Sequence, residues 1–189
     1  MRTAVILLLV AGASGSATDA IRQRDAELRA ALPPDGQALT EAGRKKIEGI
    51  VSRIVDTRAL LESALDRRWA QMTESQRRRL REAFESRFRA SGTAQLDNWR
   101  KSKIDYLPEE RAGELVRVPT RIEAQGEQSE VTYVLRDEAA GWRIVDIVVD
   151  QVSTVENYRA SFARIINREG VEGLIGRLNR GPDPKAKKE

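Results

Sequence analysis

The chain has 189 residues, of which 40% are hydrophobic and 33% charged, and its formal net charge is +4. This length suits one domain with a sizeable core, and so small a basic excess does not by itself indicate nucleic-acid binding. The sequence contains no Cys and no His, which excludes disulfides, Ser-His-Asp or Cys-His catalytic units and the usual zinc sites. We therefore expect no metal and no cofactor, and a binding protein rather than an enzyme.

The N-terminus has the three-part pattern of a secretory signal peptide. A basic residue, Arg2, precedes an apolar run from Ala4 to Val10, and small residues follow. The apolar run is shorter than the roughly 20 residues that a membrane span needs. Cleavage can fall after Ala13 or after Ala17. We predict a signal peptide over residues 1–17, a single domain over residues 18–180 and a disordered basic tail over residues 181–189.

Two helices are predicted in the first part of the domain. The first covers residues 19–32 and ends at the Pro-Pro-Asp-Gly run of residues 33–36. Thr40 is placed to cap the second helix. The apolar residues of the second helix follow the i, i+3, i+4, i+7, i+8 spacing of an amphipathic helix. They are Ile47, Ile50, Val51, Ile54 and Val55.

Two more helices follow. Asp56 is predicted to cap the third, which extends to Met72 with Trp69 on its buried side. Thr73 and Gln76 form a capping box that opens the fourth. The fourth helix buries Leu80, Phe84 and Phe88. It also carries Arg77, Arg78 and Arg81, which resemble a nucleic-acid patch but which we expect mostly to face water. The alternative is a contact with anionic lipid headgroups or an acidic partner.

The hydrophobic period changes to that of strands after Gly92. Strands are predicted over residues 102–107, 114–124, 130–138 and 141–150, and Pro119 favours an edge strand or a bulge for the second of them. Because the strands are close in sequence, they indicate an antiparallel meander. The chain as a whole is predicted to be α+β, a twisted sheet of about four strands wrapped by N-terminal helices and a C-terminal helix.

The last long strand has apolar residues on both faces. Strict alternation places Val145, Ile147 and Val149 on one face and Trp142, Ile144 and Val148 on the other. Both faces of the sheet are therefore expected to be covered. Periodicity alone leaves two explanations open, a packed core and an apolar cavity.

The C-terminal helix is predicted to begin at Ser153, which forms a second capping box with Glu156, and to end at Gly170 before a short helix over residues 171–178. Asp146 and Asp150 lie four residues apart at the end of the preceding strand. Such a pair can perform acid–base chemistry, but it is more often salt-bridged or solvated.

Two segments, residues 55–84 and residues 141–178, carry a set of distinctive positions in a fixed order. They are Asp56, Trp69, Thr73, Gln76, Phe84, Gly141, Trp142, Asp146, Val152, Ser153, Asn157, Tyr158, Arg159, Phe162, Gly170, Gly173, Leu174 and Leu178. At these positions the sequence resembles the MlaC family of periplasmic phospholipid-binding proteins, and the likeness covers roughly residues 40–178.

The resemblance implies a lipid shuttle in the periplasm. A protein of this kind encloses an apolar pocket for the acyl chains of a phospholipid. It passes the lipid between an outer-membrane lipoprotein complex and an inner-membrane ABC transporter complex, without nucleic acid and without a chemical step. The lipid-binding wall is expected to use large apolar residues on the concave side of the sheet. They are Trp69, Phe84, Phe88, Tyr133, Val145, Ile147, Val149, Phe162 and Ile166.

Two positions depart from the family pattern. Gln151 stands where the family usually has Gly, and residues 89–99 contain no Tyr where the family often has one. Of the remaining motif residues, Ser153 is expected to cap the C-terminal helix and Asp146 to pair with Arg159.

The alternative function is a ligand-free periplasmic interaction module that docks an acidic partner through its Arg-rich helix.

Overall fold

The computed structural model describes residues 15–34, 37–93 and 96–180. The first 14 residues of the predicted signal peptide and the predicted tail, residues 181–189, lie outside the described residues. Within the described ranges, no helix is both long enough and apolar enough to cross a membrane.

The second helix begins directly after its predicted cap, Thr40, whereas the first begins at Ala17, two residues before its predicted start. Ser16 caps α1 (Ala17–Ala31) and Thr40 caps α2 (Glu41–Ile54), each accepting a hydrogen bond from a backbone N–H three residues later. This satisfies one of the N–H groups that a helix start leaves unpaired. The apolar stripe of α2 is buried as predicted, with Ile47 and Ile50 each only 2% exposed.

The predicted third helix is wrong in its length. Asp56 caps α3 (Thr57–Leu65), but the helix ends at Asp66, whose φ of 48° is outside the helical region. A four-residue helix, α4 (Arg67–Ala70), follows. The Thr73–Gln76 capping box then opens α5 (Glu74–Thr93) with both of its reciprocal hydrogen bonds, and a short α6 (Leu96–Lys101) that the sequence did not predict precedes the sheet.

The sheet is antiparallel throughout and has six strands. The four predicted strands are β1, β3, β4 and β5, and the two additional ones, β2 and β6, are only three and two residues long. The order is β1-β3-β4-β5-β6, with β2 also paired to β3. The strand bounds are β1 Lys103–Tyr106, β2 Glu110–Ala112, β3 Leu115–Ala124, β4 Glu127–Glu138, β5 Gly141–Val149 and β6 Val152–Ser153.

Pro119 lies inside the sheet, so the predicted edge position of β3 is wrong. Strand β3 pairs with β4 on one side and with both β1 and β2 on the other, and its ladder with β4 has no register shift. The Pro119 carbonyl accepts the N–H of Leu107, which lies between β1 and β2. The proline ring nitrogen therefore faces this interruption, where no ladder hydrogen bond is lost.

The junction of β5 with the C-terminal helix α7 (Thr154–Arg180) is held by Asp146. Its carboxylate accepts the Ser153 hydroxyl at 2.6 Å and the Val155 N–H at 3.0 Å, while Ser153 accepts the Glu156 N–H at 3.1 Å. The capping role predicted for Ser153 is confirmed. The pairing predicted for Arg159 is wrong, since Arg159 donates to the Ser63 carbonyl of α3.

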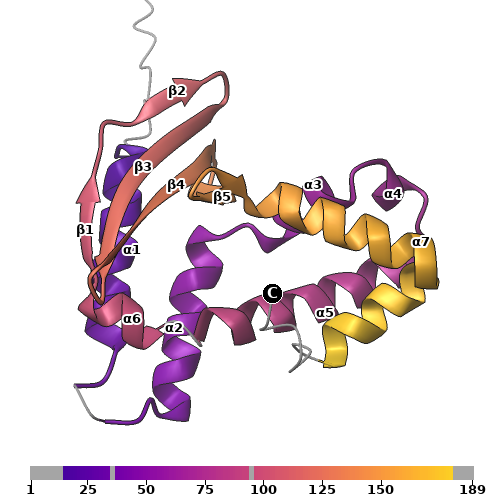
Figure 1. Ribbon diagram of the computed structural model, residues 1–189, viewed down its shortest axis with the longest axis horizontal. Coiled ribbons are helices and arrows are strands. Elements are labelled where there is room, and N and C mark those ends of the chain that lie inside the picture. Colours follow the sequence, from indigo (N-terminus) through magenta and orange to yellow (C-terminus); the bar gives the residue numbers. More distant parts are fainter. Residues whose placement is uncertain (1–14, 35–36, 94–95, 181–189) are drawn as a thin grey trace, which may run out of the picture.

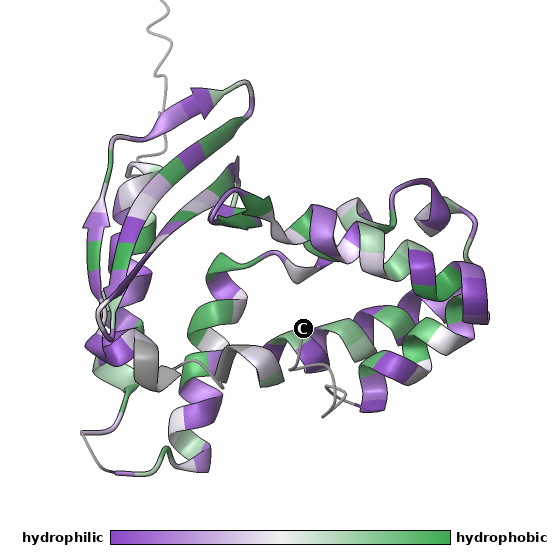
Figure 2. Cartoon of the chain, in the orientation of Figure 1, coloured by the Kyte–Doolittle hydropathy of each residue, from purple (hydrophilic) through white to green (hydrophobic). Residues whose placement is uncertain are grey.

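Two layers meet at the middle of the molecule (Figure 1). Helix α1 lies along the sheet with α2 beside it, whereas α3, α5 and α7 extend away from the sheet as a helical layer. Hydrophobic and hydrophilic residues alternate along the strands and helices of both layers (Figure 2). Gly170, at φ 69° and ψ −178°, interrupts α7 as predicted, so its last ten residues form a separate helical piece.

Candidate functional site

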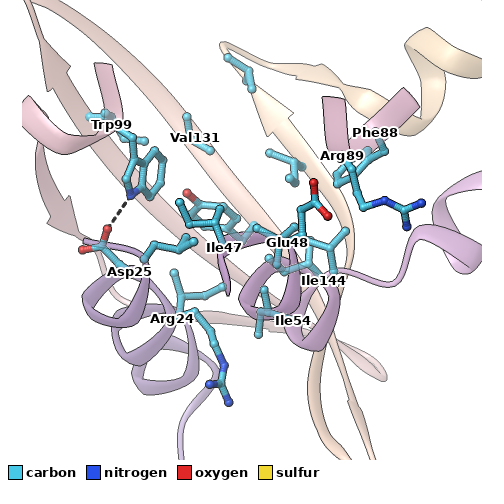
Figure 3. Close-up of a pocket in the computed structure, with 18 residues that line it drawn as sticks. Arg24, Asp25, Ile47, Glu48, Ile54, Phe88, Arg89, Trp99, Val131 and Ile144 are labelled. Atoms are coloured by element: carbon cyan, nitrogen blue, oxygen red, sulfur yellow. Dashed lines mark hydrogen bonds between the residues drawn. The ribbon is translucent and has the colours of Figure 1, made fainter. Parts of the chain in front are cut away.

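An apolar pocket of about 360 Å³ lies between the sheet and the α1–α2 layer. Figure 3 shows the 18 residues that line it, and all but four of them are apolar or aromatic. A volume of this order lies at the lower end of the range of about 300–1,000 Å³ found for ligand sites. The apolar lining consists of Ile21, Leu28, Ile47, Val51, Ile54, Val55, Phe88, Trp99, Ile122, Val131, Tyr133, Ile144, Ile147 and Val149.

A β-bulge in β5 determines which of its residues face the pocket. The register between β4 and β5 shifts between Val134 and Leu135. Val134 pairs with Asp146 and Leu135 pairs with Ile144, so Val145 is an extra residue without a partner on β4. An extra residue reverses the alternation beyond it. Ile144 before the bulge and Ile147 after it therefore line the same pocket, although the sequence alone places them on opposite faces.

Four charged residues also line the pocket: Arg24, Asp25, Glu48 and Arg89. Asp25 accepts a hydrogen bond from the Trp99 indole at 2.9 Å and from Arg29 at 3.0 Å. The first of these holds the Trp99 ring at the edge of the pocket (Figure 3). Arg24 is paired with Glu27 of its own helix, so its long aliphatic stem is the part available to the apolar wall.

The tyrosines near the pocket remain neutral at physiological pH. Burial, and to a smaller extent the nearby negative charge of Asp25, raises the pKa of Tyr106 to about 12. Burial likewise raises the pKa of Tyr133, which is 8% exposed. Neither hydroxyl is suited to act as a base near neutral pH. The part of the chain that the structure describes also has no cluster of acidic side chains able to hold a metal ion.

Four of the nine predicted wall residues line this pocket: Phe88, Tyr133, Ile147 and Val149. Val149 is 41% exposed, so it lies where the pocket meets solvent. Strand β4 contributes Tyr133 directly opposite Ile147, and Val131 directly opposite Val149. These two cross-strand pairs form the sheet side of the pocket.

The other five predicted wall residues lie elsewhere. Phe84 and Phe162 pack edge to face at 6.1 Å in an aromatic cluster with Tyr158 and Phe88, inside the helical layer. Val145 is the bulge residue of β5, and Ile166 lines a separate, more polar cleft with Arg67 and Arg68. Trp69 is the fifth, outside the pocket on α4.

Trp69 organises part of the arginine-rich segment of α5. The guanidinium groups of Arg77 and Arg81 each lie 5.6 Å from the centre of its ring, within cation–π range. Arg77 also donates to the carbonyls of Trp69 and Ala70. Arg77 and Arg81 were expected to face water, but they pack on an indole, and Arg78 is the exposed member of the three.

Sequence reasoning missed the walls that α1 and α2 contribute. The spacing of Ile47, Val51, Ile54 and Val55 marked an amphipathic helix, but it did not show that this stripe faces a cavity rather than a packed core. Ile21 and Leu28 on α1 complete that side. Trp99 carried no signal in the sequence, because it belongs to the short helix that was not predicted.

One of the comparisons with known proteins identifies a family, and another shows a similar fold. The family model of the MlaC protein matches residues 28–180, and no curated protein matches the chain. The fold is similar to the crystal structure of a phospholipid-binding protein from Ralstonia solanacearum in complex with a phospholipid. The TM-score is 0.77 at 23% identity, and the match covers 88% of this chain and 96% of the other. Since the family model spans most of the sequence, the chain belongs to the MlaC family.

Proposed function

We propose that this protein is a periplasmic phospholipid carrier that passes lipid between an outer-membrane complex and an inner-membrane ABC transporter complex. The observation that carries the proposal is the apolar pocket of about 360 Å³ between the sheet and the α1–α2 layer. Membership of the MlaC family and the phospholipid bound by the Ralstonia solanacearum protein support it.

The physical requirement for such a carrier is an apolar interior. Each buried methylene of a lipid chain is worth about 0.8 kcal/mol, so a phospholipid does not cross water readily without cover. The pocket offers hydrocarbon contacts on every wall, from α1, α2, α5 and the sheet.

The direct test is lipid loading. Purified protein is incubated with phospholipid vesicles, re-isolated and extracted for mass spectrometry. We expect close to one phospholipid per protein molecule. Ile147→Asp is expected to abolish loading, because it places a charge inside the apolar pocket.

A matched control is available on the same strand. Val148 is the next residue, is half-buried like Ile147 and does not line the pocket. Val148→Asp should therefore retain loading, provided that circular dichroism shows both variants folded. Unsubstituted protein that takes up no phospholipid would contradict the proposal and favour the alternative, a ligand-free interaction module.

The arrangement of the arginine-rich segment does not favour that alternative. Arg77 and Arg81 are stacked on Trp69, and Arg79 forms an ion pair with Glu172 of α7. These guanidinium groups bind elements of the same chain, which leaves fewer of them for an acidic partner.

A further inference from the structure

The four charged residues of the pocket divide into two groups according to their partners. Arg24 is bound to Glu27, and Asp25 is bound to both Arg29 and the Trp99 indole. Glu48 and Arg89 are less engaged. They come from different helices, α2 and α5, and Figure 3 shows both on the side of the pocket away from Trp99.

Glu48 is half-buried beside the apolar wall. Among the described residues, no hydrogen bond or ion pair engages its carboxylate. Removing a carboxylate partly from water is unfavourable unless a cation or hydrogen-bond donor replaces the lost solvent. The position therefore suits the positive group of a ligand.

Arg89 offers the complementary charge. Its side chain is 45% exposed, and its only described ion pair joins it to Glu85 of the same helix at 3.7 Å. Exposed pairs of this kind contribute little to stability. A guanidinium binds phosphate through two parallel hydrogen bonds, so a phosphate can replace Glu85 as the partner of Arg89.

We propose that Glu48 and Arg89 form a headgroup subsite at the pocket, selective for zwitterionic phospholipids that carry an ammonium group. In this assignment Arg89 binds the phosphate and Glu48 binds the ammonium, while the acyl chains occupy the pocket. The assignment rests on the proposed function. The subsite favours an ethanolamine headgroup over a glycerol headgroup. A phosphatidylglycerol has a net negative charge and carries no cation that could neutralise Glu48.

The test is a competition between two lipids in one vesicle. Protein is incubated with vesicles of equimolar phosphatidylethanolamine and phosphatidylglycerol, re-isolated, and the two bound lipids are measured by mass spectrometry. Glu48→Gln is expected to lower the ratio of bound phosphatidylethanolamine to phosphatidylglycerol about two- to fivefold, the range that one partly exposed charge pair gives. Arg89→Gln should reduce the uptake of both lipids and leave their ratio nearly unchanged, because both carry the phosphate.

Glu82→Gln is the matched control, since Glu82 is exposed on α5 and does not line the pocket. It should leave both the ratio and the total unchanged. A Glu48→Gln variant that loads lipid with the ratio of the unsubstituted protein would overturn the headgroup assignment, while normal total loading would leave the carrier function intact. Unsubstituted protein that binds neither lipid would overturn both.

Discussion

The turn between β5 and β6 contains two residues whose backbone conformation is unfavourable. Asp150 and Gln151 have φ values of 47° and 68°, in a region that residues with a Cβ rarely adopt. The cost of this backbone conformation is offset at Asp150, because its carboxylate accepts a hydrogen bond from the Glu130 N–H at 2.9 Å. No comparable side-chain hydrogen bond of Gln151 is among the described contacts. This is the position at which the sequence resemblance implied a Gly.

Gln151→Gly is expected to stabilise the protein by about 0.5–1 kcal/mol, because Gly adopts positive φ without steric cost. The measurement is the free energy of unfolding from urea denaturation. Gln128→Gly is the control, since Gln128 is an exposed residue of β4 with ordinary strand geometry, where Gly should be destabilising by a similar amount. Equal effects of the two changes would show that the turn is not strained.

At the scale of elements, α1 is attached to the sheet by the residues at its very start. The Trp142 indole donates to the Gly15 carbonyl at 2.7 Å, Ser16 caps the helix, and Ala17 is fully buried. Thr18 adds two hydrogen bonds to Glu109, at 3.1 and 3.0 Å. Since α1 forms one wall of the pocket, these contacts also position the site.

A chain that begins at Thr18 is therefore expected to be less stable than one that begins at Ser14. The loss should be about 2–4 kcal/mol, from the missing cap and the unpaired Trp142 indole, measured by urea denaturation of the two purified forms. Processing after Ala13 keeps these contacts, whereas processing after Ala17 removes the Ser16 cap, the buried Ala17 and the Gly15 carbonyl that accepts the Trp142 indole. Under the proposed export, we expect the mature chain to begin upstream of Gly15 rather than after Ala17, the end of the predicted signal peptide, as intact mass would show. Equal stability of the two forms would contradict this.

The whole molecule combines two interiors of different kinds. The helical layer is packed around fully buried side chains such as Leu60, Leu80 and Phe84. The sheet and the α1–α2 layer instead enclose a pocket. An apolar cavity forgoes dispersion contacts that a ligand can restore, so a lipid should stabilise the folded state.

Delipidated protein is expected to unfold at a lower temperature than lipid-loaded protein. At a hundredfold excess of lipid over Kd the stabilisation is about 2.7 kcal/mol, which corresponds to a rise in Tm of about 5–10 °C for a chain of this size. Differential scanning calorimetry of both forms measures it. Ile147→Asp should show no such difference, and a lipid that binds without raising Tm would argue against occupation of the pocket.

The sequence predicted four helix starts that the structure confirms, at Thr40, Asp56, Thr73 and Ser153. Each rests on a hydrogen bond to a backbone N–H only three residues away, so nearby residues alone decide it. The antiparallel sheet followed in the same way from short strands close in sequence. The break at Asp66 was not readable, because no Gly or Pro marks it.

The pocket was decided by the tertiary structure. Which residues of β5 face inward depends on the register with β4 and on the bulge at Val145, and a strand's own alternation does not contain that information. Whether the stripe of α2 meets a packed core or a cavity depends on how far the α1–α2 layer stands from the sheet. The sequence by itself therefore determined the elements, their caps and the family resemblance, whereas the space between elements distant in the chain was set only when they packed together.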